Sequence, residues 1–249
     1  MPEIVPIAAY LAGDAPRPLS GLTLLAVEDS RYACEALRLL CHHSGARLRR
    51  ADTLAAAYRH LRVYRPDVLI VDLGLPDGPG EELIAALARG TSRPRVILGT
   101  SGDALLAPAA LVAGADGFLE KPIPGVEAFQ RAILAHLPAE PGPERRPMAE
   151  PEMEPDPIAL REDLAMAEGI LATGPDARAR DYVVRFLRGV AISAQDAQLA
   201  EAAAGFGSRR PGGREADLSR LARLLRDRID RGAPVWTRGR ADGPGSLRP

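Results

Sequence analysis

Short apolar runs alternate with amphipathic stretches along the first half of the chain. The apolar runs have the length of strands buried on both faces of a parallel sheet. The stretches between them repeat apolar residues at the three- and four-residue spacing of a helix. This pattern predicts strands at 22–27, 48–51, 67–72, 95–100 and 117–120, and helices at 31–42, 53–63, 81–89, 104–113 and 126–137. Such alternation predicts an α/β fold in which helical crossovers join parallel strands.

The rest of the chain differs in composition from this first half. Seven prolines lie between positions 138 and 157, which predicts an extended linker. Beyond them the periodicity is wholly helical and predicts a small all-α bundle. The two ends show no sustained periodicity. We therefore expect a flexible N-terminal arm, an α/β domain, a proline-rich linker, a helical domain and a disordered tail, at 1–20, 21–138, 139–156, 157–231 and 232–249.

Composition and charge narrow the class of protein. The chain has 249 residues, of which 46% are hydrophobic, and its formal net charge is −1. This is typical of a globular protein with one large or two modest domains. No apolar run approaches the roughly 20 residues of a membrane-spanning helix, so no membrane partner is expected. Cys34 and Cys41 lie seven residues apart on one predicted helix, which separates them by about 10 Å. A disulfide is excluded at that distance, and a cytoplasmic location is expected.

Charged and hydroxyl side chains follow the predicted strands. Glu28, Asp29, Asp72 and Thr100 lie at the ends of three strands, and Lys121 follows the last. The carboxyl ends of parallel strands meet at one edge of a sheet. Carboxylates gathered there repel one another and need a cation, and oxygen ligands favour Mg²⁺. Lys121 is the only lysine among 32 basic residues. Either its position requires an ammonium rather than a guanidinium, or a single lysine codon survived by chance.

Together these residues resemble the receiver domain of bacterial two-component response regulators. The resemblance covers about residues 21–138 and rests on several motifs that occur in the expected order. They are Glu28-Asp29, the run from Asp72 to Asp77 with Gly80, Thr100, the segment 113–118 and Lys121-Pro122. The resemblance implies a doubly wound, flavodoxin-like sheet of five parallel strands in the order 2-1-3-4-5. It also implies a signalling protein rather than an enzyme.

The resemblance implies a role for each acidic residue of the site. Asp72 would be the phosphoacceptor and would attack a phosphohistidine on a sensor histidine kinase or histidine phosphotransferase. Asp29, supported by Glu28, would bind Mg²⁺ together with Asp72 and the backbone carbonyl of Gly74. The alternative is a degenerate receiver that acts as a scaffold without phosphorylation, in which the aspartates serve only as caps. Four other aspartates are interpreted as turn or cap residues, namely Asp67, Asp77, Asp103 and Asp116.

The resemblance also implies a conformational switch. Lys121 would pair with a phosphoryl oxygen, Thr100 would turn to hydrogen-bond the phosphoryl group, and Phe118 would move inward behind it. The sequence departs from the family at several positions, two of which flank Thr100. Gly99 stands where a bulky apolar residue is common, and Ser101 is a rival to Thr100 for the hydroxyl role.

Several outputs remain open for the helical domain. Residues 104–115 contain no charge, so helix 104–113 is either an interface, such as that of a homodimer, or a face covered by the C-terminal bundle. Residues 209–240 carry ten arginines and four acids, which allows DNA binding, although no helix-turn-helix pattern is present. The bundle lacks histidine and lysine, which excludes histidine phosphotransfer. We favour control of protein–protein interactions, with the bundle as a possible dimer contact, over transcription.

Overall fold

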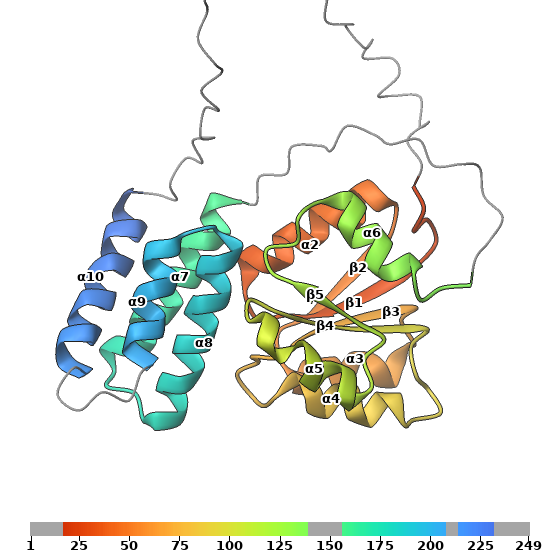
Figure 1. Ribbon diagram of the computed structural model, residues 1–249, viewed down its shortest axis with the longest axis horizontal. Helices are drawn as coiled ribbons and strands as arrows, with labels where there is room; N and C mark the ends of the chain where they lie inside the picture. The colour runs from red at the N-terminus through yellow and green to blue at the C-terminus, as the bar shows by residue number, and fades with distance from the viewer. Residues whose placement is uncertain (1–16, 139–155, 208–213, 232–249) are drawn as a thin grey trace, which may run out of the picture.

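The computed structural model describes residues 17–138, 156–207 and 214–231, which form an α/β unit and a helical bundle (Figure 1). Strands and helices alternate through the α/β unit, as the hydrophobic pattern predicts. Its elements are β1 (Thr23–Val27), α2 (Arg31–Ser44), β2 (Arg47–Ala51), α3 (Leu54–Val63), β3 (Val68–Asp72), α4 (Gly80–Ala88), β4 (Val96–Ser101), the 3-10 turn η1 (Ala104–Leu106), α5 (Ala107–Ala113), β5 (Gly117–Glu120) and α6 (Val126–Leu134).

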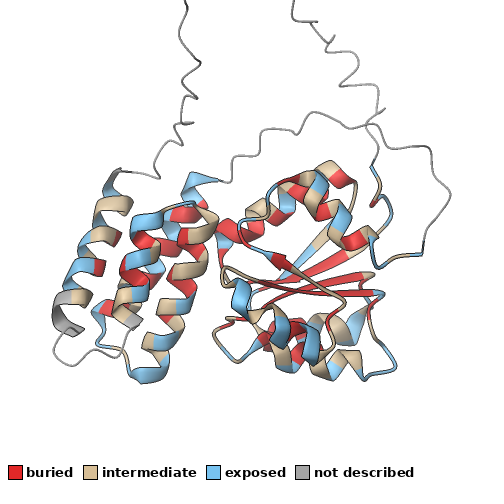
Figure 2. Ribbon diagram, viewed as in Figure 1, coloured by how far each residue is buried: buried red, intermediate tan, exposed pale blue. Residues whose placement is uncertain are grey.

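All five strands are parallel and follow the order β2-β1-β3-β4-β5, so the predicted topology is confirmed. Helices α2 and α6 cover one face of the sheet, and α3, α4 and α5 cover the other (Figure 1). The central strand β3 is buried at every position. Because both faces of the sheet are covered, the three central strands β1, β3 and β4 are nearly continuous apolar runs, and they are buried along almost their whole length (Figure 2). The edge strand β2 instead carries three arginines and is mostly exposed.

Alternate residues of the central strands supply two separate cores. Leu25 and Leu69 point toward α3, α4 and α5, whereas Leu24 and Ile70 point toward α2 and α6. Residues 17–20, which we assigned to the N-terminal arm, lie against the second core. Leu19 is fully buried there, and its amide donates to the carbonyl of Ser44 at 3.0 Å. Residues 1–16 lie outside the described residues.

The second unit consists, in its described part, of α7 (Pro157–Ala172), α8 (Ala177–Ser193), α9 (Ala197–Gly207) and α10 (Arg214–Arg231). Aspartate side chains cap the first three helices, at Asp156, Asp176 and Asp196. Their apolar stripes pack into one core that includes Leu164, Leu187 and Leu221. The predicted small helical bundle is thus confirmed, while residues 139–155 and 232–249 of the predicted linker and tail lie outside the described residues.

The bundle packs against the amino end of α2 through α7 and α8 (Figure 1). Of the two alternatives for helix 104–113, cover by the bundle is therefore wrong for the described residues. Leu105 and Val112 on that helical segment are 86% and 89% exposed. An uncharged segment shows that a face is apolar but not which neighbour it meets. No helix among the described residues has the length and apolar character needed to cross a membrane.

Candidate phosphorylation site

Three carboxylates meet at the carboxyl edge of the sheet. Glu28 and Asp29 follow β1, and Asp72 is the last residue of β3, the strand that pairs with β1. Each offers one oxygen, and these oxygens lie within 4.8 Å of one another. Glu28 and Asp72 are buried, and Asp29 is half-buried. The parallel register therefore brings together the acids that the sequence places at two separate strand ends.

Lys121 reaches the same cluster from the end of β5. Its ammonium Nζ lies 2.6 Å from Glu28 Oε2 and 3.4 Å from Asp72 Oδ2. The side chain is only 8% exposed, so its charge is directed inward rather than toward solvent. A single ammonium cannot neutralise three ionised carboxylates, so the three acids oppose one another's ionisation.

The charges and burial of these groups shift their pKa values. Burial raises the pKa of Glu28 to about 8, against the opposing effect of the Lys121 charge. Burial and the neighbouring charge of Asp72 raise the pKa of Asp29 to about 7. Burial alone would lower the pKa of Lys121, but the charges of Asp72 and Glu28 outweigh it and hold this pKa above its usual value. The carboxyl groups thus resist ionisation together, because burial and mutual repulsion outweigh the single charge of Lys121.

The loop after β3 is held tightly against the strand end. A Cβ at Gly80 would overlap the backbone carbonyl oxygen of Asp72, so a side chain at this position is excluded sterically. Gly74 lies beside the same carboxylate, since a Cβ placed there would stand 3.8 Å from Asp72 Oδ2. Asp77 lies outside the cluster, and its carboxylate accepts hydrogen bonds from the amides of residues 54 and 55 at the start of α3. The two glycines therefore allow the chain after β3 to lie close to Asp72.

Thr100 and Ser101 occupy different environments at the end of β4. Thr100 is the register partner of Asp72, is 2% exposed, and donates from Oγ1 to the carbonyl of Leu119 at 2.7 Å. Ser101 is half-buried, and its hydroxyl accepts from the amide of Asp103 at 3.1 Å. The hydroxyl beside Asp72 is therefore that of Thr100, while Ser101 supports the following turn.

Phe118 lies over Gly99, which accounts for the departure from the family at that position. A Cβ at Gly99 would stand 2.7 Å from Ala110 Cβ and 3.3 Å from Phe118 Cδ2. Phe118 itself is half-buried. The absence of a side chain on β4 thus lets α5 approach the sheet closely and leaves room for the aromatic ring.

The four aspartates assigned to turns and caps lie away from the cluster. Asp67 accepts from the amide of Thr23, and Asp116 accepts from the amide of Ile97 and pairs with Arg93. Asp103 caps η1, and Asp77 lies at the start of α3. Ser30, rather than Asp29, caps α2 with its hydroxyl. The acids of the cluster are therefore distinct from those that shape the loops.

Sequence reasoning missed two bundle residues that reach this edge. The Tyr182 hydroxyl of α8 donates to Asp29 Oδ2 at 2.8 Å. Asp163 of α7 accepts hydrogen bonds from Ser30 Oγ and from the amides of Arg31 and Tyr32, at 2.8, 3.0 and 3.1 Å. From the sequence, Tyr182 can be recognised only as part of the apolar stripe of α8. Asp163, however, interrupts the apolar face of its helix, and this was an available signal for a buried polar contact.

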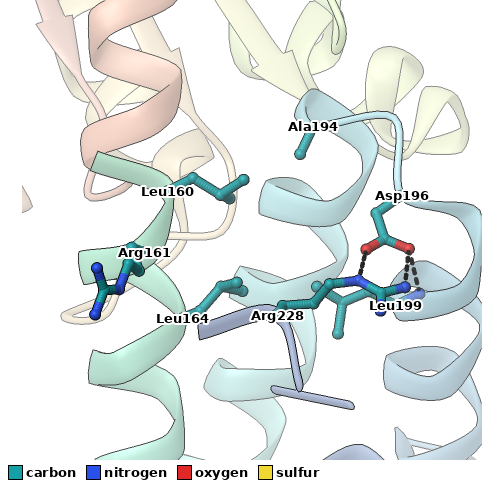
Figure 3. Close-up of a pocket in the computed structure, with 7 residues that line it drawn as sticks. All are labelled: Leu160, Arg161, Leu164, Ala194, Asp196, Leu199 and Arg228. Atoms are coloured by element: carbon teal, nitrogen blue, oxygen red, sulfur yellow. Dashed lines mark hydrogen bonds and ion pairs between the residues drawn. The ribbon is translucent and has the colours of Figure 1, made fainter. Parts of the chain in front are cut away.

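A separate shallow pocket lies within the bundle, away from the cluster (Figure 3). Its charged groups are Asp196 and Arg228, whose side chains meet at 2.7 Å, and Arg161, which points away. The remaining lining is apolar, from Leu160, Leu164, Ala194 and Leu199. Because the paired charges satisfy each other, we interpret this pocket as part of the packing of the bundle.

Comparison with known proteins places this edge in context. Residues 24–133 match the family model described as "Response regulator receiver domain". The chain is 35% identical over 114 residues to the KDP operon transcriptional regulatory protein KdpE of Escherichia coli. This alignment covers 46% of the chain and 50% of KdpE. It is 30% identical over 131 residues to the photosynthetic apparatus regulatory protein RegA of Rhodobacter capsulatus, covering 52% of this chain and 71% of RegA.

A solved structure is similar over the same part of the chain. It is a CheY-like response regulator receiver domain from Methylobacillus flagellatus, 25% identical, with a TM-score of 0.41. The similarity covers 47% of this chain and 98% of that structure. The chain spans about half the length of the first curated relatives it matches.

Proposed function

The chain belongs to the response regulators of two-component systems, and on this premise we propose that it accepts a phosphoryl group on Asp72. One observation carries the proposal: the Asp72 carboxylate lies beside two further carboxylates and within 3.4 Å of the Lys121 ammonium. A carboxylate so placed can act as a nucleophile toward an electrophilic phosphorus. The chemical class of donor that fits is a phosphohistidine on a sensor histidine kinase or a histidine phosphotransferase.

The gathered oxygens fit a divalent cation of the Mg²⁺ type. Their donor set is all oxygen, they lie within 4.8 Å of one another, and once ionised the three carboxylates carry more negative charge than Lys121 can neutralise. Glu28, Asp29, Asp72 and the backbone carbonyl of Gly74 would hold the ion. Mg²⁺ bound there would supply charge neutralisation for the phosphoryl oxygens.

The remaining steps of the transfer depend on residues of the chain itself. As the oxygen–phosphorus bond forms on Asp72, the nitrogen–phosphorus bond of the donor breaks and the imidazole leaves. Lys121 presents a compact positive charge to a phosphoryl oxygen. Thr100 gives up its hydrogen bond to the Leu119 carbonyl to bind the new group, and Phe118 packs behind it. The buried Thr100 hydroxyl and the half-buried Phe118 ring thus act together as a two-state element.

For the output we propose protein–protein contact, including self-association through η1 and α5. Leu105, Leu111 and Val112 form an exposed apolar patch there, 86%, 49% and 89% exposed. Val112→Glu should weaken concentration-dependent association in sedimentation. Val63→Glu is the matched control, because Val63 is 84% exposed on α3. Equal association of both variants and the native chain would contradict the proposal.

DNA binding is the second candidate, and it draws on the curated relatives described as transcriptional regulatory proteins. Two arginines of the Arg-rich segment 209–240 are already paired with acidic residues of the bundle. Arg226 lies 3.1 Å from Glu168, and Arg228 lies 2.7 Å from Asp196. This pairing favours a structural role for α10. A salt-dependent mobility shift with duplex DNA would favour transcription instead.

The phosphoacceptor assignment is tested with acetyl phosphate and Mg²⁺. The native chain should gain one phosphoryl group by intact mass, Asp72→Asn should gain none, and EDTA should prevent the gain. Asp77→Asn is the matched control from the same loop, since Asp77 caps α3, and it should be labelled like the native chain. Full labelling of the Asp72 variant would refute the assignment.

A further inference from the structure

One face of helix α8 contacts the loops that surround the carboxylate cluster. The Tyr182 hydroxyl is bound to Asp29 after β1. A Cβ at Gly74, after β3, would stand 3.9 Å from the Cβ of Arg185. A Cβ at Gly102, after β4, would meet Ile192 at 2.8 Å and the Cα of Gly189 at 3.5 Å. The four residues of α8 follow one another at spacings of three and four, which places them on one helical face: Tyr182, Arg185, Gly189 and Ile192.

The bundle is anchored beside this face by Asp163. The aspartate is 2% exposed and accepts three hydrogen bonds at the amino end of α2. A carboxylate is favoured at this end of a helix, where free amide groups and the helix dipole attract negative charge. Tyr32 of α2 is buried in the core of the bundle rather than in that of the α/β unit. The contact therefore combines a buried polar anchor with apolar packing.

The ion pairs at the rim of the contact are weaker. Arg31 and Glu162 meet at 2.7 Å, but their side chains are 60% and 50% exposed. Arg188 and Asp103 lie 3.6 Å apart and are also partly exposed. Exposed pairs contribute little to stability. The specificity of docking thus depends on Asp163, Tyr32 and the face of α8.

The docked position of the bundle opposes cation binding by the carboxylate cluster. Tyr182 directs its hydroxyl proton at Oδ2 of Asp29, so that proton faces a cation approaching the same oxygen. Helix α8 also lies over the loop that follows Asp72, from the side on which the cluster is gathered. We infer that the helical bundle and a divalent cation compete for Asp29, and that the docked bundle holds the phosphorylation site closed. This inference rests on the proposed function, because it concerns regulation of that same site.

Competition has a reciprocal consequence. If docking weakens cation binding by some factor, cation binding must weaken docking by the same factor. Metal and the phosphoryl donor are thereby expected to release the bundle from the edge of the sheet. The face of α8 then becomes available to partners only when the site is in use.

The first test measures metal affinity of the full chain with Mn²⁺ alone, following free Mn²⁺ by electron paramagnetic resonance. Tyr182→Phe removes one hydroxyl and should tighten binding by about tenfold or more, the effect of a hydrogen bond to a charged group. Asp163→Ala removes the anchor without touching the cluster and should also tighten binding. The matched controls are Tyr58→Phe and Asp181→Ala, at exposed positions on α3 and α8. Both should bind Mn²⁺ like the native chain.

The outcomes separate this inference from the proposed function. If Asp72→Asn weakens Mn²⁺ binding while the Tyr182 and Asp163 variants bind like the native chain, the cation site stands and the competition is refuted. If neither the native chain nor any variant binds Mn²⁺, the proposed cation site itself fails. Tighter binding by both bundle variants, with unchanged controls, supports the competition.

A second measurement needs no substitution. Hydrogen exchange of the native chain should show slow exchange for the amides of Arg31 and Tyr32, which donate to Asp163. At saturating Mn²⁺ these amides should exchange faster, while those of β3 stay protected. Unchanged protection of both amides at saturation would overturn the inference, even if a variant fails to fold.

Discussion

Replacing Gly99 by alanine tests the close approach of α5 to the sheet. By local propensity alone the change should stabilise a strand, by about 0.5–1 kcal/mol, because glycine loses more backbone freedom on folding. In this fold the new Cβ would stand 2.7 Å from Ala110 Cβ. Carbon atoms in contact prefer about 3.5–4.0 Å, so α5 would have to shift by roughly 1 Å.

The net effect follows from these opposing contributions. Overpacking of a core costs about 1–3 kcal/mol, which exceeds the propensity gain. We expect the α/β unit of Gly99→Ala to lose about 1–2 kcal/mol, which lowers its unfolding temperature by roughly 5–10 °C in calorimetry of the full chain. The ring of Phe118, 3.3 Å from the new Cβ, should also be displaced.

The same substitution at a second glycine provides the control. Gly169 lies within α7, and no heavy atom lies within 4 Å of the position its Cβ would take. Gly169→Ala should therefore stabilise the bundle, by about 1 kcal/mol. A Gly99→Ala chain that unfolds at the native temperature or above would refute the steric argument.

Two further predictions concern the bundle and the cysteines. Asp196 caps α9 and binds Arg228, whose hydrogen bond helps to hold the pKa of Asp196 below its usual value against the effect of burial. Asp196→Ala should lower the free energy of unfolding of the bundle by about 2–4 kcal/mol in urea, with Asp181→Ala near neutral. Because the pKa of Asp196 is lower in the folded state, the ionised side chain stabilises the bundle fully above about pH 4, and this stabilisation is lost as the pH falls further. If Asp196→Ala lowered the free energy of unfolding at pH 2 as much as at neutral pH, this reasoning would be contradicted. Burial raises the pKa of Cys41 to about 12 and the pKa of Cys34 still further. A thiol reagent at neutral pH should therefore modify both only after unfolding, and rapid modification of the folded chain would contradict the burial.

The hydrophobic pattern suffices for the centre of the α/β unit because the strands β1, β3 and β4 are covered on both faces. A run such as residues 67–72 can then be recognised without knowledge of its neighbours. The meeting of Asp29 and Asp72 follows from parallel topology, which brings strand ends to one edge. Element ends are less well determined: the helix predicted at 126–137 ends at Leu134. Its last residues form a turn whose hydrogen bonds the periodicity does not encode.

The position of the bundle could not be predicted in the same way. An apolar stripe indicates that a face is buried but not which surface covers it, so the sequence suggested α5 as a contact and gave no indication of α2. The decisive contacts are made by Asp163 and Tyr182, each paired with a residue more than 130 positions away. Only the folded arrangement shows that a helix cap and a tyrosine hydroxyl join the bundle to the acidic cluster.

The most direct measurement locates the phosphoryl group. The full chain is treated with acetyl phosphate and Mg²⁺, digested under conditions that preserve acyl phosphates, and analysed by fragment mass spectrometry. The account predicts a phosphoryl group on Asp72 and on no other residue. A phosphoryl group on another aspartate or on a histidine, with Asp72 unmodified, would contradict it.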